Sequence, residues 1–136
     1  MRHDDFIGQV QARARLSSRG DAESATRATL ETLGERIPEQ LAENLASQLP
    51  REIGGHLRRT IVAGGAATGE RFGLAEFTQR VAARAGQDEP KAVYSARAVL
   101  EVVREATTGG VIDHVRQALP GELRDLVDAG SSGQLR

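Results

Sequence analysis

Cysteine is absent from the 136-residue chain, and tryptophan is absent as well. The lack of cysteine excludes disulfides, thiolate nucleophiles and cysteine-bound metals. Aromatic residues make up only 3% of the sequence, and Ala, Leu, Arg and Glu, which are strong helix formers, take their place. The composition therefore favours an all-α protein.

Long apolar runs are missing too. No stretch approaches the roughly 20 apolar residues that a membrane-spanning helix needs. Asp4 and Asp5 interrupt the N-terminal stretch in which a signal peptide would carry its apolar run. We therefore expect a cytoplasmic protein that has no membrane partner.

An excess of charge of one sign is also lacking. The chain has 18 Lys and Arg against 19 Asp and Glu, and both halves are close to neutral. A dedicated nucleic-acid-binding domain normally carries a clear basic excess. Nucleic acid is therefore not the first partner that we expect.

What the chain does contain is an internal repeat. Residues 5–14 resemble 76–85 at an offset of 71, residues 27–35 resemble 97–105 at an offset of 70, and LPRE at 49–52 returns as LPGE at 119–122. The matches extend across the whole unit and need only one gap, so we interpret them as a duplication. Each Leu-Pro-x-Glu is interpreted as a corner, where Pro breaks one helix and Glu falls in the first turn of the next.

Apolar residues at three- and four-residue spacing predict about four short helices in each unit. The predicted fold class is all-α, with two tandem pseudo-symmetric repeats packed as one bilobed helical domain. The first repeat covers residues 1–62, a Gly/Ala-rich linker 63–70, the second repeat 71–130 and a frayed tail 131–136. Gly54 and Gly55 have no glycine counterparts in the second repeat, so we expect the helix that contains them to be short or kinked.

The order of the motifs F-x3-V-x2-R-A, R-A-x-L-E and L-P-x-E, written twice, resembles the bacterial Domain of Unknown Function 2267 family. The resemblance runs from about Asp4 to Asp128. It implies a small, cytoplasmic, mostly helical bacterial protein. It implies no established activity and supplies no catalytic or binding residues.

Motifs for catalysis, cofactors and metals are not found. His3, His56 and His114 are scattered and occupy no matching repeat positions. The glycine-rich stretch 64–70 lacks the Gly-Lys-Ser/Thr of a P-loop, and no serine lies in a nucleophile elbow. We therefore expect a protein that is not an enzyme and that has no cofactor, metal or catalytic site.

Several charged residues recur in both repeats, although a shared core explains only the apolar matches. The recurring pairs are Arg13/Arg84, Arg27/Arg97, Glu31/Glu101, Glu35/Glu105 and Glu52/Glu122. Arg27 and Glu31 stand four residues apart and can pair within one helix, as can Arg97 and Glu101. Alternatively, each Arg crosses to a neighbouring helix and fixes the packing. We expect a structural role, and these Arg/Glu surfaces are also candidates for an interaction surface.

The most basic stretch is PREIGGHLRRT, residues 50–60. It gathers Arg51, His56, Arg58 and Arg59 and has no counterpart in the second repeat. This segment is a candidate surface for an acidic partner or a nucleic acid, although it offers no aromatic residue for base stacking. A solvated helix end is the simpler interpretation.

We therefore expect a non-enzymatic helical module that binds a protein partner or associates with itself. One alternative is a nucleic-acid-associated regulator that uses residues 51–59. Another is a small-ligand carrier or enzyme with a pocket between the two lobes, lined by convergent polar groups.

Overall fold

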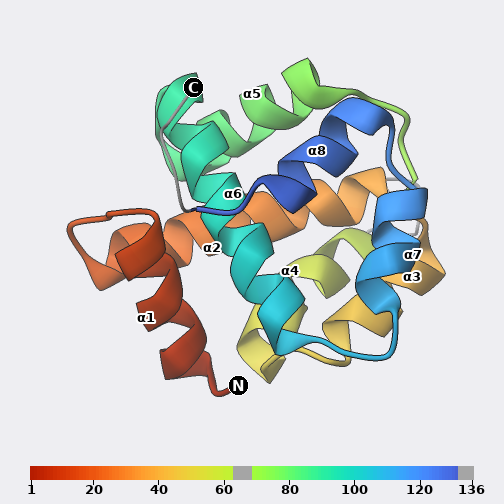
Figure 1. The fold of residues 1–136 in the computed structure, drawn as a ribbon, viewed down its shortest axis with the longest axis horizontal. Coiled ribbons are helices and arrows are strands. Elements are labelled where there is room, and N and C mark those ends of the chain that lie inside the picture. The colour runs from red at the N-terminus through yellow and green to blue at the C-terminus, as the bar shows by residue number, and fades with distance from the viewer. Residues whose placement is uncertain (63–68, 132–136) are drawn as a thin grey trace.

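The computed structural model describes residues 1–62 and 69–131, and this part of the chain contains helices and no strand. The all-α prediction is therefore confirmed. The helices are α1 (His3–Arg13), α2 (Arg19–Arg36), α3 (Glu39–Ala46), α4 (Arg51–Val62), α5 (Leu74–Ala85), α6 (Glu89–Ala106), α7 (Val111–Gln117) and α8 (Gly121–Ala129) (Figure 1).

The two long helices begin at equivalent positions of the two repeats. Ser18 precedes α2, and its hydroxyl accepts a hydrogen bond from the Asp21 amide at 3.1 Å. Asp88 precedes α6, and its carboxylate accepts one from the Lys91 amide at 2.9 Å. Such caps satisfy backbone donors that the first helical turn leaves free. The same kind of N-cap, at positions 70 residues apart, therefore sets where each long helix starts.

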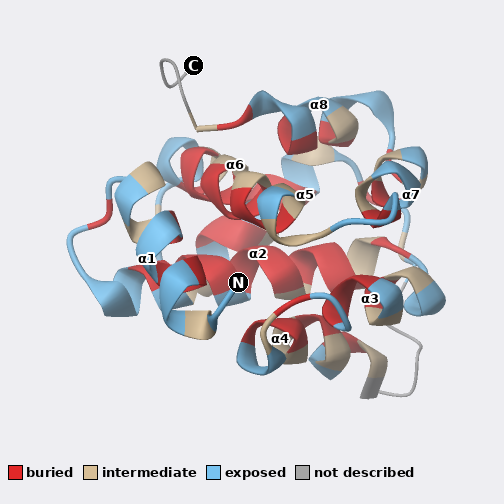
Figure 2. Cartoon of the chain, turned by 60° about the horizontal axis from the view of Figure 1, so that its bottom comes forward, coloured by how far each residue is buried: buried red, intermediate tan, exposed pale blue. Residues whose placement is uncertain are grey.

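The core is built around α2 and α6, which cross near the centre of the molecule (Figure 1). Helices of the two repeats interleave, because α1 packs against α6 while α5 packs against α2. Buried residues, coloured red on the ribbon in Figure 2, come from both repeats, and the apolar ones form one connected cluster. The bilobed packing stays a prediction.

The predicted linker and tail fall largely outside the described residues, namely at 63–68 and 132–136. At the end of the linker, the amides of Gly69 and Glu70 donate to the carbonyls of Ile37 and Glu35, at 3.0 and 2.9 Å. At the start of the tail, Ser131 donates to Glu101 through both its amide and its hydroxyl. The residues that flank both undescribed segments are therefore held against the helices.

The fourth helix of the first repeat is not shortened, which corrects the expectation from its glycines. Helix α4 has 12 residues, whereas its counterpart α8 has nine. A Cβ atom on Gly54 would lie 2.5 Å from the carbonyl oxygen of Ala46, so this glycine allows α3 and α4 to approach closely. Arg124 stands at the equivalent position of α8 and donates to the carbonyls of Arg116 and Leu119 instead.

Candidate functional site

Some of the recurring charges of the two repeats pair with each other across the molecule. Arg13 of the first repeat donates to Glu101 at 2.9 Å and to both oxygens of Glu105 at 2.7 Å. In the second repeat, Arg84 donates to the two oxygens of Glu35 at 2.8 and 2.7 Å. Each arginine therefore reaches the long helix of the opposite repeat, in a reciprocal exchange.

These contacts shift the ionisation of the acids involved. Burial raises the pKa of Glu35, but the hydrogen bonds from Arg84 and Arg80 outweigh this effect and leave the pKa below its usual value. The hydrogen bond from Arg13 is the main cause that lowers the pKa of Glu105. Arg13 and Arg84 thus have a structural role together with Glu105 and Glu35, because their contacts hold α1 to α6 and α5 to α2.

Arg27 and Arg97 are equivalent in sequence but differ in surroundings. Arg97 is half-buried, and its Nε donates to the carbonyl of Gly130 at 2.8 Å. Arg27 is exposed on α2. Glu31 lies one turn further along the same helix, but its partners are Arg59 at 3.2 Å and Arg84 at 3.8 Å.

Acidic side chains meet part of the basic segment 51–59. Arg58 lies against Glu43 of α3 at 2.9 Å, and Arg59 lies against Glu31 of α2. Arg51 is exposed at the first position of α4. Two of the three arginines in this segment therefore have an acidic partner, which reduces the positive charge available to a nucleic acid.

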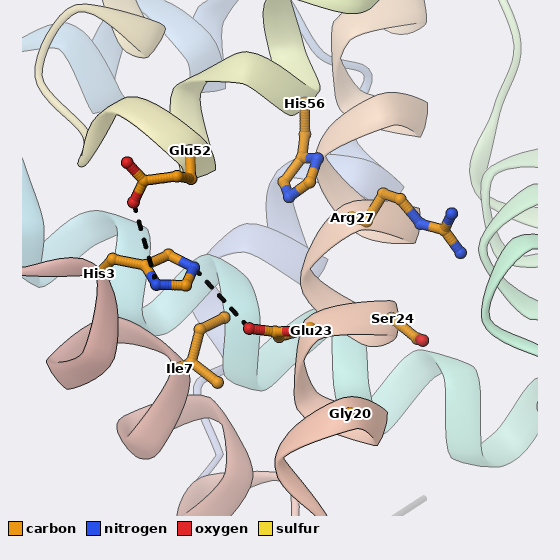
Figure 3. Close-up of a pocket in the computed structure, with 8 residues that line it drawn as sticks. All are labelled: His3, Ile7, Gly20, Glu23, Ser24, Arg27, Glu52 and His56. Carbon is orange, nitrogen blue, oxygen red and sulfur yellow. Dashed lines mark ion pairs between the residues drawn. The ribbon is translucent and has the colours of Figure 1, made fainter.

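A polar cleft of about 390 Å³ opens between α1, α2 and α4. Its lining residues are His3, Ile7, Gly20, Glu23, Ser24, Arg27, Glu52 and His56 (Figure 3). The His3 ring points between two acids, with Nε2 3.9 Å from Glu23 and Nδ1 3.9 Å from Glu52. Residues from three helices thus line one hollow, and the Arg27 guanidinium points away from the His56 ring (Figure 3).

His56 enters the polar cleft as a neutral ring. Burial lowers its pKa to about 4, and the nearby charges of Arg59, Arg27 and His3 act in the same direction. The Arg59 guanidinium contacts the Nδ1 atom of His56.

An apolar cleft of about 720 Å³ occupies the equivalent place in the second repeat, between α5, α6 and α8. Its lining residues are Leu74, Ala75, Thr78, Glu89, Pro90, Val93 and Glu122. Five positions correspond between the two clefts, namely His3/Leu74, Ile7/Thr78, Gly20/Pro90, Glu23/Val93 and Glu52/Glu122. The two repeats therefore carry equivalent clefts, of which the first is lined mainly by polar residues and the second mainly by apolar ones.

A smaller hollow of about 310 Å³ lies where the two repeats meet. Its lining residues are Arg36, Pro38, Gly69, Arg71, Gln117 and Ala118. Burial lowers the pKa of Arg36, and the charge of Arg71 adds to this effect. This hollow adjoins the undescribed segment 63–68, so the two intra-repeat clefts are the better defined candidates.

Comparison with models of protein families identifies the family of this chain. The model of a family described as "Uncharacterized conserved protein (DUF2267)" matches residues 3–126, which is nearly the full length. The chain belongs to the DUF2267 family. A search of curated proteins found no match.

The described part of this DUF2267 protein contains neither a cluster of metal-binding side chains nor a membrane-spanning helix. Within residues 1–62 and 69–131, no group of three or more His, Asp or Glu side chains is placed to hold a metal ion. Over the same residues, no helix combines the length and the apolar character needed to cross a membrane.

Sequence reasoning located part of the polar cleft of this DUF2267 protein and missed the rest. His56 and Arg27 were both predicted as interaction residues, and the structure brings them to one cleft. His3, Glu23 and Ser24 were not predicted. The signal that identifies them is the position-by-position difference between the repeats, because each has an apolar or aromatic residue at its counterpart.

Proposed function

We propose that this DUF2267 protein is a non-enzymatic interaction module of the bacterial cytoplasm, and that its apolar cleft binds an amphipathic helix of a partner protein. The main observation behind this proposal is that the cleft is lined by apolar residues that remain open to solvent. Leu74 and Val93 are half-buried and pack on the core with one side, while their other side faces the hollow. Helical peptides commonly dock in such grooves through apolar residues at three- and four-residue spacing.

The negative charge at the edge of the apolar cleft favours a basic partner over an acidic one. Glu89 and Glu122 both line the cleft and are exposed. Carboxylates at the rim attract a helix that carries Lys or Arg beside its apolar face, and they repel an acidic one. We therefore expect a partner segment that is apolar on one side and basic at its borders.

The test is a titration of the full chain with two fluorescent amphipathic peptides, one built from Leu and Lys and the other from Leu and Glu. The basic peptide is expected to bind at least tenfold more tightly than the acidic one. Val93→Glu, which copies Glu23 of the first repeat, is expected to weaken binding at least tenfold. Ala83→Glu adds the same charge at an exposed position of α5 outside the cleft and is expected to have little effect.

Two outcomes would contradict the proposal. One is that the two peptides bind equally, or that a folded Val93→Glu variant, checked by circular dichroism, binds as the parent does. The other is that light scattering shows a dimer which Val93→Glu dissociates and the basic peptide does not. In that case a second copy of this chain, rather than a partner helix, covers the cleft.

A further inference from the structure

The hollow of about 310 Å³ where the two repeats meet, which we call the inter-repeat hollow, lies where one contact between the repeats has no copy. Just after α3, the side-chain amide of Gln48 donates to the carbonyl of Thr108 at 3.1 Å and accepts from the Thr108 amide at 2.7 Å. The equivalent residues, 70 positions away, are Ala118 and Pro38, and both line the hollow. Alanine has no side-chain amide and proline has no N–H, so these hydrogen bonds cannot form there.

Hydrogen bonds at the end of α2 position the lining of the inter-repeat hollow. The Nε atom of Arg36 donates to the carbonyl of Phe72 at 2.6 Å, and the amides of Gly69 and Glu70 donate to carbonyls at the end of α2. The end of α2, the segment before α5 and the end of α7 meet at the right of Figure 1. Arg36 is therefore fixed by the fold, while its terminal nitrogens donate to no other described residue.

Two arginines bring positive charge to the inter-repeat hollow. Arg36 is half-buried and Arg71 is exposed, and both line the hollow. The acids next to them in the sequence, Glu35 and Glu70, pair with Arg80 instead. In the part of the chain that the structure describes, neither Arg36 nor Arg71 therefore forms an ion pair with an acid.

The neighbouring segment cannot supply the missing carboxylate, because residues 63–68 contain no Asp or Glu. Burial lowers the pKa of Arg36, and the charge of Arg71 adds to this effect, so keeping both cations there has a cost. Helix α6 ends with Ala106 at the position where α2 ends with Arg36, so a long helix of this fold can end without an arginine. An anion bound in the hollow would offset the cost of the two charges.

We propose that the inter-repeat hollow binds a dianionic phosphate group, either free or on a small molecule, against Arg36 and Arg71. A guanidinium presents parallel N–H donors that match two oxygens of a phosphate, and such charge-assisted hydrogen bonds are the stronger kind. The amide of Gln117, which also lines the hollow, can donate to a further oxygen. This site is separate from the apolar cleft and does not depend on the function proposed for it.

Isothermal titration of the full chain at about pH 8 and constant ionic strength tests the proposal with three probes. The probes are inorganic phosphate and glycerol 3-phosphate, which are dianions at this pH, and dimethyl phosphate, which is a monoanion. We expect the dianions to bind at least tenfold more tightly than dimethyl phosphate, because only they balance both arginines. Tighter binding of glycerol 3-phosphate would assign the site to a phosphorylated small molecule, and equal or weaker binding would assign it to free phosphate.

A charge substitution tests the role of the arginines. Arg71→Gln removes an exposed charge of the hollow and is expected to weaken the binding of both dianions at least tenfold. Arg51→Gln removes an exposed charge of α4 outside the hollow. It is the matched control and is expected to have little effect.

A pair of substitutions at Ala118 tests the location of the site. Ala118→Glu places a carboxylate where the phosphate is proposed to lie and is expected to lower the affinity at least tenfold. Ala118→Gln copies Gln48 and adds a side chain of the same size without the charge, so it is expected to retain more affinity. Circular dichroism checks that both variants fold.

The proposal is overturned if neither dianion binds the parent at millimolar concentration. Equally tight binding of dimethyl phosphate would also overturn it, because it would indicate a site for phosphate diesters such as those of nucleic acids. Unchanged binding in Arg71→Gln, or in a folded Ala118→Glu variant, would place any phosphate bound by the protein outside this hollow.

Discussion

Single positions at which the two repeats differ have large local effects. Gly54 and Gly55 are neighbours in α4, but their surroundings are unlike. A Cβ on Gly54 meets the Ala46 carbonyl, whereas nothing lies within 4 Å of a Cβ on Gly55. One glycine is required by packing, and the other only weakens the helix.

This contrast predicts opposite effects for two alanine substitutions. Gly54→Ala is expected to lower the free energy of unfolding by about 2 kcal/mol, because α3 and α4 must separate. Gly55→Ala is expected to raise it by about 0.5–1 kcal/mol, because alanine is the better helix former. Urea denaturation of the two variants measures both. A stabilising Gly54→Ala would show that α3 and α4 are not in close contact.

The neutral ring of His56 predicts a loss of stability in acid. Its pKa is about 4 in the folded protein, while a histidine in the unfolded chain has a pKa of about 6.5. As the pH falls from about 6.5 to 4, the unfolded chain takes up a proton that the folded protein does not, so stability decreases. Part of the ring is open to solvent, so we expect a loss of only about 1 kcal/mol.

His56→Leu, which copies Leu126 of the second repeat, removes this dependence. Urea denaturation at pH 7 and pH 4.5 is expected to show a smaller decrease for this variant than for the parent. His114→Gln is the control, since His114 is exposed on α7, and it is expected to behave as the parent does. An identical decrease in His56→Leu would contradict the neutral state of His56.

Pairs of helices are joined by the reciprocal ion pairs. The side chains of Arg13 and Glu101 are only 23% and 17% exposed, which shields their contact from solvent more than a surface pair. Arg13→Gln is expected to lower the free energy of unfolding by about 1 kcal/mol. Arg19→Gln, which removes an exposed partner of Asp4, is the control and is expected to have little effect.

The ion pair of Arg13 with Glu105 also loses stabilisation in acid, but through the loss of an ionic contact rather than through burial of a neutral ring. Arg13 keeps the pKa of Glu105 below its unfolded value, so the stabilisation is present above about pH 4.5 and is lost as the carboxylate is protonated at lower pH. The difference between the parent and Arg13→Gln is therefore expected to shrink as the pH falls below about 4. A difference that stays constant down to pH 3 would indicate a packing effect rather than an ionic one.

At the level of helices, the sequence predicts the fold class but does not predict which side chains contact each other between helices. Three- and four-residue periodicity and the repeated Leu-Pro corners predict the helices, because both signals are local in the chain. The partners of Arg13 lie 88 and 92 residues away, and periodicity carries no information about such pairs. Crossing to a neighbouring helix was one predicted alternative for the repeated arginines, but the helix that each one reaches came only from the structure.

The two clefts show a second limit of sequence reasoning. Each is assembled from three helices, so no single segment carries its pattern. His3 and Glu52 are far apart in the chain, and only the packing of α1 near α4 brings them together. Aligning the repeats position by position does mark the residues involved, because polar and apolar partners then stand opposite each other.

For the whole molecule, the interleaving of the repeats predicts one cooperative unfolding transition. Helices α1 and α5 each pack on the long helix of the other repeat, and the core is one cluster. Residues 1–62 and 71–131, expressed separately, are therefore expected to show much less helix than the full chain by circular dichroism, and to regain it on mixing. Two independently folded halves, or two transitions in urea, would contradict this.

The reciprocal exchange of arginines also bears on the origin of the chain. In a symmetric dimer, a residue of one copy contacts its target in the other copy, and the same contact returns in the opposite direction. Arg13 on Glu105 and Arg84 on Glu35 repeat that arrangement within one polypeptide. The protein thus has the contact pattern expected of two subunits joined in one chain. Two copies within one chain need not be identical, and here one cleft is lined mainly by polar residues while the other is lined mainly by apolar ones.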